Sequence, residues 1–407
     1  MRVVDTLRSV LRFRPIEWDP DLRRLRTAAS VADLRRLARR RLPRGVFDYI
    51  DGGAEDELSL RRNVEAFRRV EFCPRVLNDV GRVDISTTLL GRPMPLPLVL
   101  APTGFTRIAT SGGELDVARA AARAGIPYTL STLATRSIEE VAAVSDGPKW
   151  FQVYVWKDRG LVKDMLSRAT NSGYEAIMLT VDTAVLGRRE RDVRRGFTLP
   201  PKIGAATLLD GLVHPQWTWD FVRAEPIMFA NIVGTGAPDG ARVATLADYI
   251  NTQFDASLSW KDLDWFRSAW AGPIVLKGVQ AVDDARRAAD AGIEAIALSN
   301  HGGRQLDGAP PILELVSPVV EAIGDRVEII CDGGVRRGSD IVKAVALGAR
   351  ACMAGRAYLY GLGAAGELGV DHVIALLDCG MRRTMALTGC RTISDLRPDL
   401  VRWRTWG

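Results

Sequence analysis

The sequence predicts a single (β/α)8 TIM barrel in the α/β class, with an N-terminal helical extension and a long insertion after strand 4. Two observations lead to this prediction. From residue 95 onward, eight short apolar runs alternate with segments of helical periodicity. Continuous apolar runs of this kind are typical of parallel strands that are buried on both faces. An open, doubly wound sheet is the alternative architecture for such alternation.

The eight expected strands are short, and most end in polar residues or glycine. In chain order they are Pro95–Pro102, Pro127–Thr132, Trp150–Val155, Ala176–Asp182, Pro273–Val279, Ala295–Asn300, Val327–Asp332 and Ala351–Arg356. When eight such units close into a barrel, their carboxyl ends meet at one mouth. We therefore look for the reactive groups at the ends of these runs.

Helical periodicity fills most of the gaps between the strands. The expected helices include Glu114–Ala124, Asp283–Ala291 and Gly338–Leu347 in the barrel and Val31–Arg41 in the extension. Gly125, Gly292 and Gly348 follow the three barrel helices. Glycine is common just past a helix end because it adopts the left-handed conformation without steric cost. Pro43 is expected to stop the helix of the extension or to start another.

One domain is expected over residues 1–407. It divides into an extension (1–94), the barrel (95–390) and a C-terminal tail (391–407). Between Asp182 and Pro273 the chain is far longer than one helix needs, and residues 197–260 are interpreted as an insertion or lid. A long connection without clear periodicity is usually functional or mobile.

Composition fits a globular protein in a reducing compartment. Charged residues make up 26% of the chain, the formal net charge is +6, and the five cysteines form no C-x-x-C pair. The arginine-rich run Arg35–Arg44 is interpreted as a solvated helix face, because no nucleic-acid motif accompanies it. We expect no metal site, no membrane-spanning stretch and no secretory signal, and hence a cytoplasmic protein.

The ends of strands 7 and 8 are rich in glycine and arginine. Strand 7 ends in Asp332, Gly333 and Gly334 with Arg336 beyond, and strand 8 ends in Gly355 and Arg356. Loops at these positions of a TIM barrel often bind phosphate through bare backbone N–H groups with an arginine nearby. Tight turns with surface arginines are the alternative interpretation.

One of the three histidines, His301, lies between an expected strand and two glycines. This position at the mouth favours a general base, although a lone histidine is often structural. A base of this kind needs an acid to orient its ring, and Asp182 at the end of strand 4 is the candidate. Arg189 and Arg304 are candidates for a carboxylate clamp, with surface ion pairs as the alternative.

Lys277 ends an apolar strand, where a charge is costly unless it has a function. Two functions are open. The lysine forms a Schiff base, as in aldolases, or it places positive charge beside a cofactor that accepts electrons. The segment Gly361–Gly366 matches G-x-G-x-x-G but follows the last strand, so it is interpreted as loop glycine and not as a dinucleotide site.

Several motifs in the same order resemble the FMN-dependent 2-hydroxy acid oxidases and dehydrogenases. The strongest is SNHGGRQLD (Ser299–Asp307). Others are FDYIDGGAEDE (Phe47–Glu57), APTGF (Ala101–Phe105), WFQVYVWKDR (Trp150–Arg159), TVDTAVLGRRERD (Thr180–Asp192) and DGGVRRGSD (Asp332–Asp340). The resemblance covers about residues 30–395. HPQWTWD (His214–Asp220) and FDASLSWKDLDW (Phe254–Trp265) look most like bacterial respiratory L-lactate dehydrogenases.

The resemblance implies FMN across the barrel mouth. Lys277 would lie beside the pyrimidine side of the ring and stabilise its anionic reduced form. The other implied cofactor contacts are Pro102, Thr103, Gly104, Ser131, Gln152 and Thr180 around the ring, Ser299 at an edge or on the chain, and Asp332, Gly334, Arg336, Gly355 and Arg356 along the ribityl chain and phosphate.

The resemblance also implies a substrate site for a small (S)-2-hydroxy acid, with L-lactate first. Arg189 and Arg304 would pair with the carboxylate, and Tyr49 and Tyr154 would donate hydrogen bonds. His301 would take the proton, assisted by Asp182. Hydride transfer and a carbanion route both stay open.

Further expectations concern partners and substrate size. Leu133 stands where glycolate oxidase has a bulky aromatic, so an oxidase or tailoring enzyme for a larger acid, such as mandelate or a modified peptide, is the second hypothesis. Gly104 leans toward a dehydrogenase over an oxidase. The acceptor is expected to be quinone or oxygen, and the assembly a tetramer or octamer. The aromatic residues of 197–260 suit a peripheral contact at the inner face of the cell membrane, a lid or a subunit contact. A non-catalytic flavin-binding scaffold is the third hypothesis.

Overall fold

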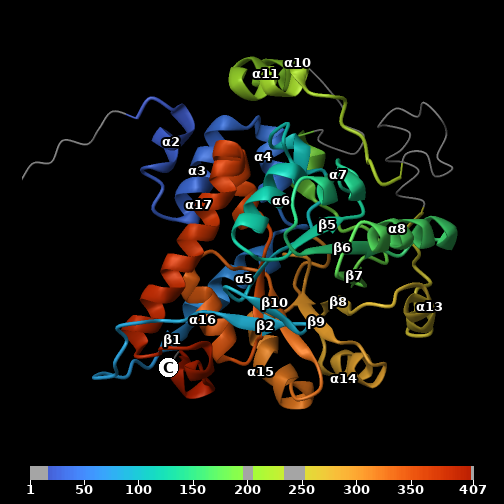
Figure 1. The fold of residues 1–407 in the computed structure, drawn as a ribbon. Helices are drawn as coiled ribbons and strands as arrows, with labels where there is room; N and C mark the ends of the chain where they lie inside the picture. Colours follow the sequence, from blue (N-terminus) through green and yellow to red (C-terminus); the bar gives the residue numbers. More distant parts are fainter. Residues whose placement is uncertain (1–16, 196–204, 233–252, 405–407) are drawn as a thin grey trace, which may run out of the picture.

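The computed structural model describes residues 17–195, 205–232 and 253–404. Its centre is a closed barrel of eight parallel strands in the order β10-β11-β4-β5-β6-β7-β8-β9. Helices surround this barrel, and the extension and the last helix lie together on one side (Figure 1). The predicted TIM barrel is confirmed, and the doubly wound alternative is wrong.

All eight predicted barrel strands are present. They are β4 (Leu98–Leu100), β5 (Tyr128–Ser131), β6 (Lys149–Tyr154), β7 (Ala176–Thr180), β8 (Ile274–Val279), β9 (Ala295–Ser299), β10 (Glu328–Asp332) and β11 (Ala351–Ala354). The barrel helices are α6 (Glu114–Arg123), α7 (Ile138–Ala143), α8 (Arg159–Asn171), α14 (Val282–Asp290), α15 (Ile312–Ile323), α16 (Gly338–Ala346) and α17 (Arg356–Thr388).

Leu89 and Met94 belong to the hairpin of β2 (Thr87–Leu89) and β3 (Arg92–Met94), and both are buried against the interior of the barrel. Their neighbours include Trp150, Ala176 and Ala295, which stand near the amino ends of their strands. The hairpin therefore packs under the amino end of the barrel. The interior above it is filled by apolar side chains such as Met178 and Val275, so the barrel is a packed core and not a pore.

Residues 17–94, the described part of the extension, contain four helices, α2 (Pro20–Leu25), α3 (Val31–Arg41), α4 (Arg44–Asp51) and α5 (Leu58–Arg69). As predicted, α3 spans Val31–Arg41, and Pro43 separates it from α4. Helix α3 packs on α17, and β1 (Val70–Phe72) pairs with β12 (Val401–Trp403) of the C-terminal tail. Two short 3-10 turns, η2 (Ile393–Asp395) and η3 (Pro398–Leu400), precede β12.

Gly361–Ala364 is helical and belongs to α17, whereas Ala365 and Gly366 are not helical, so the interpretation of the segment as loop glycine was wrong for most of it. Helix α17 is interrupted at Ala365 and Gly366, and the backbones of Gly361 and Gly369 meet closely across this kink. A side chain at either glycine would collide with the other backbone. The glycines therefore serve close helix packing and not a phosphate.

The insertion is described in part, since residues 196–204 and 233–252 lie outside the described ranges. Around it lie α9 (Glu190–Arg195), α10 (Ala205–Leu212), α11 (Pro215–Arg223) and α13 (Asp262–Ala269). Helices α10 and α11 stand at the outer edge of the molecule, above α4 and α6 (Figure 1). Side-chain hydrogen bonds connect α11 to the loop after β4, which contains η1 (Thr106–Ile108). Trp217 Nε1 donates to the Ile108 carbonyl over 2.7 Å, and Asp220 accepts from Ser111 Oγ over 2.6 Å.

Candidate active site

A belt of polar side chains joins the carboxyl ends of six consecutive barrel strands, β5 to β10. On β5 to β7, Ser131 Oγ donates to Gln152 Oε1 over 2.9 Å, and Gln152 Nε2 donates to Thr180 Oγ1 over 3.0 Å. On β8 to β10, Lys277 Nζ lies 3.2 Å from Ser299 Oγ, which donates to Asp332 Oδ2 over 2.8 Å. Strand order alone therefore brings six sequence-distant polar groups together.

His301 stands on a turn that bends sharply at the end of β9. Its φ is +56°, and Gly302 and Gly303 follow at +65° and +73°. A run of three left-handed residues is only practical where two of them are glycine. Asn300 holds the turn through reciprocal side-chain bonds with Asn63 of α5, at 2.7 and 3.0 Å. The turn directs the imidazole of His301 into the cavity at the mouth of the barrel.

The imidazole lies between an acid and a phenol. Nδ1 of His301 is 3.0 Å from Oδ1 of Asp182, and Nε2 is 3.4 Å from the Tyr154 hydroxyl. Asp182 fits beside β8 because β8 carries a bulge at Gly278. A Cβ on Gly278, whose φ is +105°, would lie 2.7 Å from the Asp182 side chain. The bulge glycine therefore makes room for the acid.

Burial sets the protonation of this pair. Burial lowers the pKa of His301 below its usual value, and the charge of Asp182 opposes this only in part. Burial would raise the pKa of Asp182, but His301 and Lys277 outweigh it and the pKa lies below its usual value. The resting pair is thus a neutral imidazole beside a carboxylate, which is the state of a general base.

Two guanidinium groups flank Tyr49 of α4. The Cζ atoms of Arg189 and Arg304 lie 5.5 and 5.0 Å from the centre of the Tyr49 ring. Burial lowers the pKa of Arg304, and the positive charge of Arg189 lowers it further. Arg189 Nε is paired with Asp192 Oδ2 over 2.7 Å, yet two half-buried like charges in one cavity are still costly, and a bound carboxylate would relieve that cost.

Arg304 and Arg356 both bind main-chain carbonyls at the end of α4. Arg304 Nη1 donates to Tyr49 O over 2.7 Å. Arg356 Nη2 donates to Gly52 O over 2.6 Å, and its Nε donates to Ile50 O over 3.1 Å. Carbonyls at a helix C-terminus lack partners within the helix and attract cations. The barrel mouth and the extension are therefore joined through two arginines.

The loop after β10 passes close to α5 at Gly334. Its φ is +84°, and a side chain there would collide with the Asn63 carbonyl. Arg336 on the same loop lies with its Cζ 5.7 Å from the Tyr360 ring, and its Nη1 binds the Val335 carbonyl over 2.7 Å. This loop therefore has the glycine backbone and the nearby arginine on which the prediction of a phosphate site was based.

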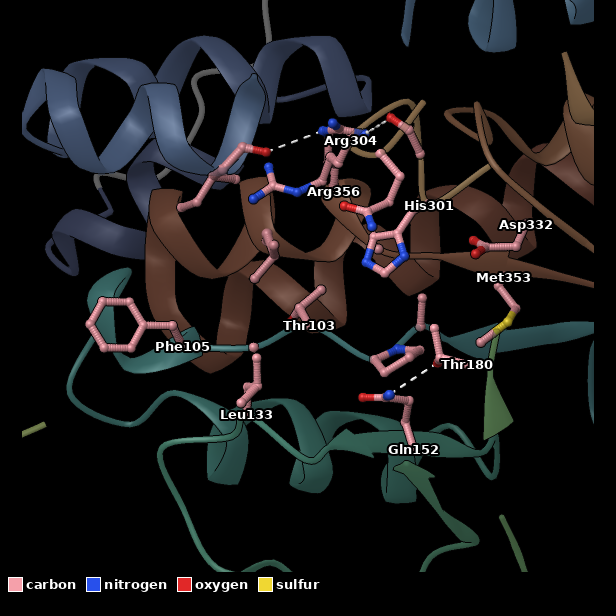
Figure 2. Close-up of a pocket in the computed structure, with 18 of the residues that line it drawn as sticks. Thr103, Phe105, Leu133, Gln152, Thr180, His301, Arg304, Asp332, Met353 and Arg356 are labelled. Carbon is pink, nitrogen blue, oxygen red and sulfur yellow. Dashed lines mark hydrogen bonds between the residues drawn. The ribbon is translucent and has the colours of Figure 1, made fainter. Parts of the chain in front are cut away.

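One open cavity contains most of the predicted site. It encloses about 1500 Å³ of empty space, solvent at its mouth included. Its lining includes Tyr49, Pro102, Thr103, Gly104, Gln152, Tyr154, Thr180, Arg189, Lys277, His301, Arg304, Asp332, Gly334, Arg336, Gly355 and Arg356. Ser131, Asp182 and Ser299 do not line it but bond to residues that do. Figure 2 shows Arg304 and Arg356 on one side of the cavity, Leu133 and Gln152 on the other, and His301 between them.

Sequence reasoning missed the aromatic wall of the cavity. Phe105, Phe229 and Phe254 line it. Phe229 and Phe254 come from the insertion. The Phe229 ring packs on Phe105 at a tilt of 32° with ring centres 5.7 Å apart, and Phe254 meets Tyr154 edge to face at 5.3 Å. No pattern in the sequence indicates where an insertion folds back. The insertion aromatics that were expected at a membrane, lid or subunit contact therefore fall into two groups. Phe229 is buried in the cavity wall, whereas Trp219 is 62% exposed.

The donor set of the cavity fits FMN. Its polar belt offers Lys277, Gln152 and Thr180 to a flat heterocycle with many acceptors, and two glycine-rich loops with Arg336 and Arg356 suit a phosphate. Lys277 is buried and lies 3.3 Å from Asp332, which is a charge arrangement with no evident role in folding alone. Among the residues that the structure describes, no group of His, Cys, Asp and Glu is arranged to hold a metal ion.

Comparisons with known proteins agree with this chemistry. The model of the FMN-dependent dehydrogenase family matches residues 38–403. The chain is 47% identical to a Mycobacterium tuberculosis protein whose naming as an L-lactate dehydrogenase is provisional, over 98% of this chain and 95% of that one. It is 43% identical to the L-lactate dehydrogenase of Caulobacter vibrioides, over 92% and 97%. The crystal structure of the monotopic membrane protein (S)-mandelate dehydrogenase matches with a TM-score of 0.89 and 42% identity, over 93% of this chain and all of that one.

Proposed function

The chain belongs to the FMN-dependent dehydrogenase family and oxidises a 2-hydroxy acid, and we propose that this acid is L-lactate, the product being pyruvate. The observation that carries the proposal is the juxtaposition of His301, Asp182 and two arginines in one cavity. Relatives named for L-lactate support this substrate.

In this proposal the carboxylate of the acid pairs with Arg189 and Arg304, whose mutual repulsion it relieves. Binding there brings C2 and its hydroxyl toward His301. The neutral imidazole accepts the substrate proton, and Asp182 stabilises the imidazolium that results. Tyr154, 3.4 Å from the imidazole, donates to the substrate oxygen.

FMN, when bound, accepts the two electrons that the acid loses. We propose that Gln152 and Thr180 hold its ring edges, with Ser131 orienting the Gln152 amide from behind and Pro102–Gly104 against its face. Lys277 places a positive charge beside the ring, paired at rest with Asp332. The remaining donors, on Gly334, Arg336, Gly355 and Arg356, hold the phosphate end.

Anaerobic flavin bleaching tests the proposal. Purified protein should carry FMN, and L-lactate added without oxygen should bleach its yellow colour. D-lactate serves as the matched control for the handedness of the site. A protein that stays yellow with every 2-hydroxy acid in a panel would refute the function.

A second candidate substrate is a larger acid such as mandelate. The wall formed by Phe105, Leu133 and Phe229 offers more apolar surface than a methyl group needs. The similarity to (S)-mandelate dehydrogenase supports this candidate. Comparing reduction rates for L-lactate and (S)-mandelate decides between them, and a strong preference for lactate would exclude mandelate as the main substrate.

We also propose that α10 and α11 dock on an anionic membrane surface. Leu212, Val213 and Val222 are each more than 70% exposed, and Trp219 is 62% exposed with Arg223 stacked 4.2 Å over its ring. An apolar helix face with arginine beside it suits the interface of a bilayer. Among the described residues, no helix is both long and apolar enough to cross a membrane. The contact would therefore be peripheral.

Membrane docking favours a quinone over oxygen as the electron acceptor. Reoxidation of the lactate-reduced enzyme should be faster with a soluble quinone analogue than with dissolved oxygen. Assembly as a tetramer or octamer stays a prediction that light scattering can test.

A further inference from the structure

The Gln305 side chain bridges the two loops that carry the proposed base and the proposed carboxylate clamp. Its Oε1 accepts from the Gly187 N–H over 2.9 Å. Its Nε2 donates to the carbonyls of Val185 and Asp182 over 2.9 and 3.1 Å. The oxygen and the nitrogen of this side-chain amide both bind the loop that follows β7. The backbone of Gln305 belongs to the loop after β9, which carries His301.

The bridged loop has no regular structure of its own, and its far end is held by the Glu55 N–H on the Arg188 carbonyl over 2.9 Å. Residues 183–187 form no helix or strand, and Val185 and Leu186 are 72% and 46% exposed. Two of the three Gln305 bonds end on Val185 and Gly187, the residues on either side of Leu186. Leu186 lines the cavity, and Arg189 follows two residues after Gly187. The position of Leu186 over the cavity therefore depends on this amide.

A second observation shows that the two loops are fitted to each other. A Cβ on Gly187 would collide with the Arg304 carbonyl and would lie 2.6 Å from the Gln305 carbonyl. Only a glycine lets the loops approach closely enough for the Gln305 amide to reach both sides of Leu186. Gln305 also lines the cavity, so the bridge forms part of its rim.

We propose that Gln305 is a positioning residue that holds Leu186 over the C2 substituent of the substrate and, together with the Asp192 carboxylate that pairs with Arg189, keeps Arg189 at the substrate carboxylate. It sets substrate affinity and the discrimination between small and large acids without touching the transferred proton. This inference rests on the proposed function, because Leu186 and Arg189 are placed by it in the substrate site.

The test compares FMN-loaded wild type with Gln305→Met, which keeps the side-chain length and removes all three bonds. Loss of two or more hydrogen bonds should raise the KM for L-lactate by at least about tenfold. The Kd of pyruvate, followed through the flavin spectrum, should rise in parallel, and kcat should change far less. The ratio of kcat/KM values for lactate and mandelate should move toward one. Gln216→Met on α11, which removes a surface bond to Arg24, is the matched control.

Two further variants test the proposal even if Gln305→Met fails to fold. Gln305→Glu keeps the acceptor for Gly187 but loses the amide donor, and it should show the same changes. Leu186→Ala removes the side chain that Gln305 is said to place, so the lactate-to-mandelate ratio should change less on Gln305→Met when Leu186 is already absent. Additive effects in this cycle, or unchanged KM and pyruvate Kd in soluble, FMN-loaded Gln305 variants, overturn the inference. Wild type that oxidises no hydroxy acid overturns the proposed function instead.

Discussion

Nδ1 of His301 lies 3.0 Å from Oδ1 of Asp182, although the two residues are 119 positions apart. They come from the loops after β9 and β7, which reach the same side of the mouth. The Asp182 carboxylate fixes the proton of the neutral ring on Nδ1, so that Nε2 is left to accept a proton. This contact governs the first prediction.

Asp182→Asn is expected to lower kcat and to move the pH profile. The pKa of His301 already lies below its usual 6.5, and Asp182 is the group that raises it. Because the imidazole must be neutral to act, wild-type kcat/KM should fall as the pH drops through a value below 6.5. Removing the carboxylate lowers that value further and costs roughly 10²- to 10⁴-fold in kcat. An acid limb that moves to higher pH in the variant would contradict the assignment.

His301→Asn is expected to abolish lactate-dependent bleaching while FMN stays bound. Asparagine suits this position because it tolerates the left-handed conformation that His301 adopts. Stopped-flow absorbance should show a reduction rate lower by roughly 10²- to 10⁴-fold. His372→Asn, on α17 with a single bond to the Ala28 carbonyl, should bleach at the wild-type rate. Rapid bleaching in the His301 variant would remove the base from the mechanism.

Arg189→Met is expected to raise the KM for L-lactate by roughly 10- to 100-fold, since a charge-assisted hydrogen bond contributes about 1.5–3 kcal/mol. The neighbouring Arg188 is exposed, so Arg188→Met is the matched control. Steady-state kinetics with both variants decide the matter. Equal KM values in the two would show that the carboxylate binds elsewhere.

Replacing Trp219 and Val222 by serine is expected to weaken binding to anionic vesicles. Each buried apolar side chain contributes about 1.5–3 kcal/mol, so the partition coefficient should fall by more than about tenfold. Leu387, near the C-terminal end of α17, is as exposed as Val222 at 72%, and Leu387→Ser should bind vesicles like wild type. Co-sedimentation measures both. If the Leu387 variant loses as much, α11 is not the docking face.

The barrel and the strand-end residues were predictable because each strand is a continuous apolar run with one polar end. The positions of Gln152, Lys277 and Asp332 follow from that pattern alone, and strand order then makes them neighbours. The end of α3 was also predictable, because Leu42-Pro43 closes the helix.

Contacts made by side chains on main-chain atoms were not predictable. Nothing in the sequence pairs Arg356 with the carbonyls of Ile50 and Gly52, or Gln305 with Val185. Such partners depend on where two loops from different strands come to rest. The place of Phe229 in the cavity wall was missed for a similar reason, since the return path of the insertion has no periodic signal. The helical position of Gly361 was not predicted, because glycine is found at close helix contacts as well as in loops.

The carbonyls of Tyr49 and Gly52 decide how far this chain can be shortened. A barrel that began after Gly52 would leave Arg304 and Arg356, both half-buried, without carbonyl acceptors that they now have. Uncompensated charge of that kind destabilises the fold and pulls the arginines away from their places. The helices of the extension thus form part of the active-site wall. A fragment trimmed to the minimal barrel would lose catalytic activity and would fold less cooperatively.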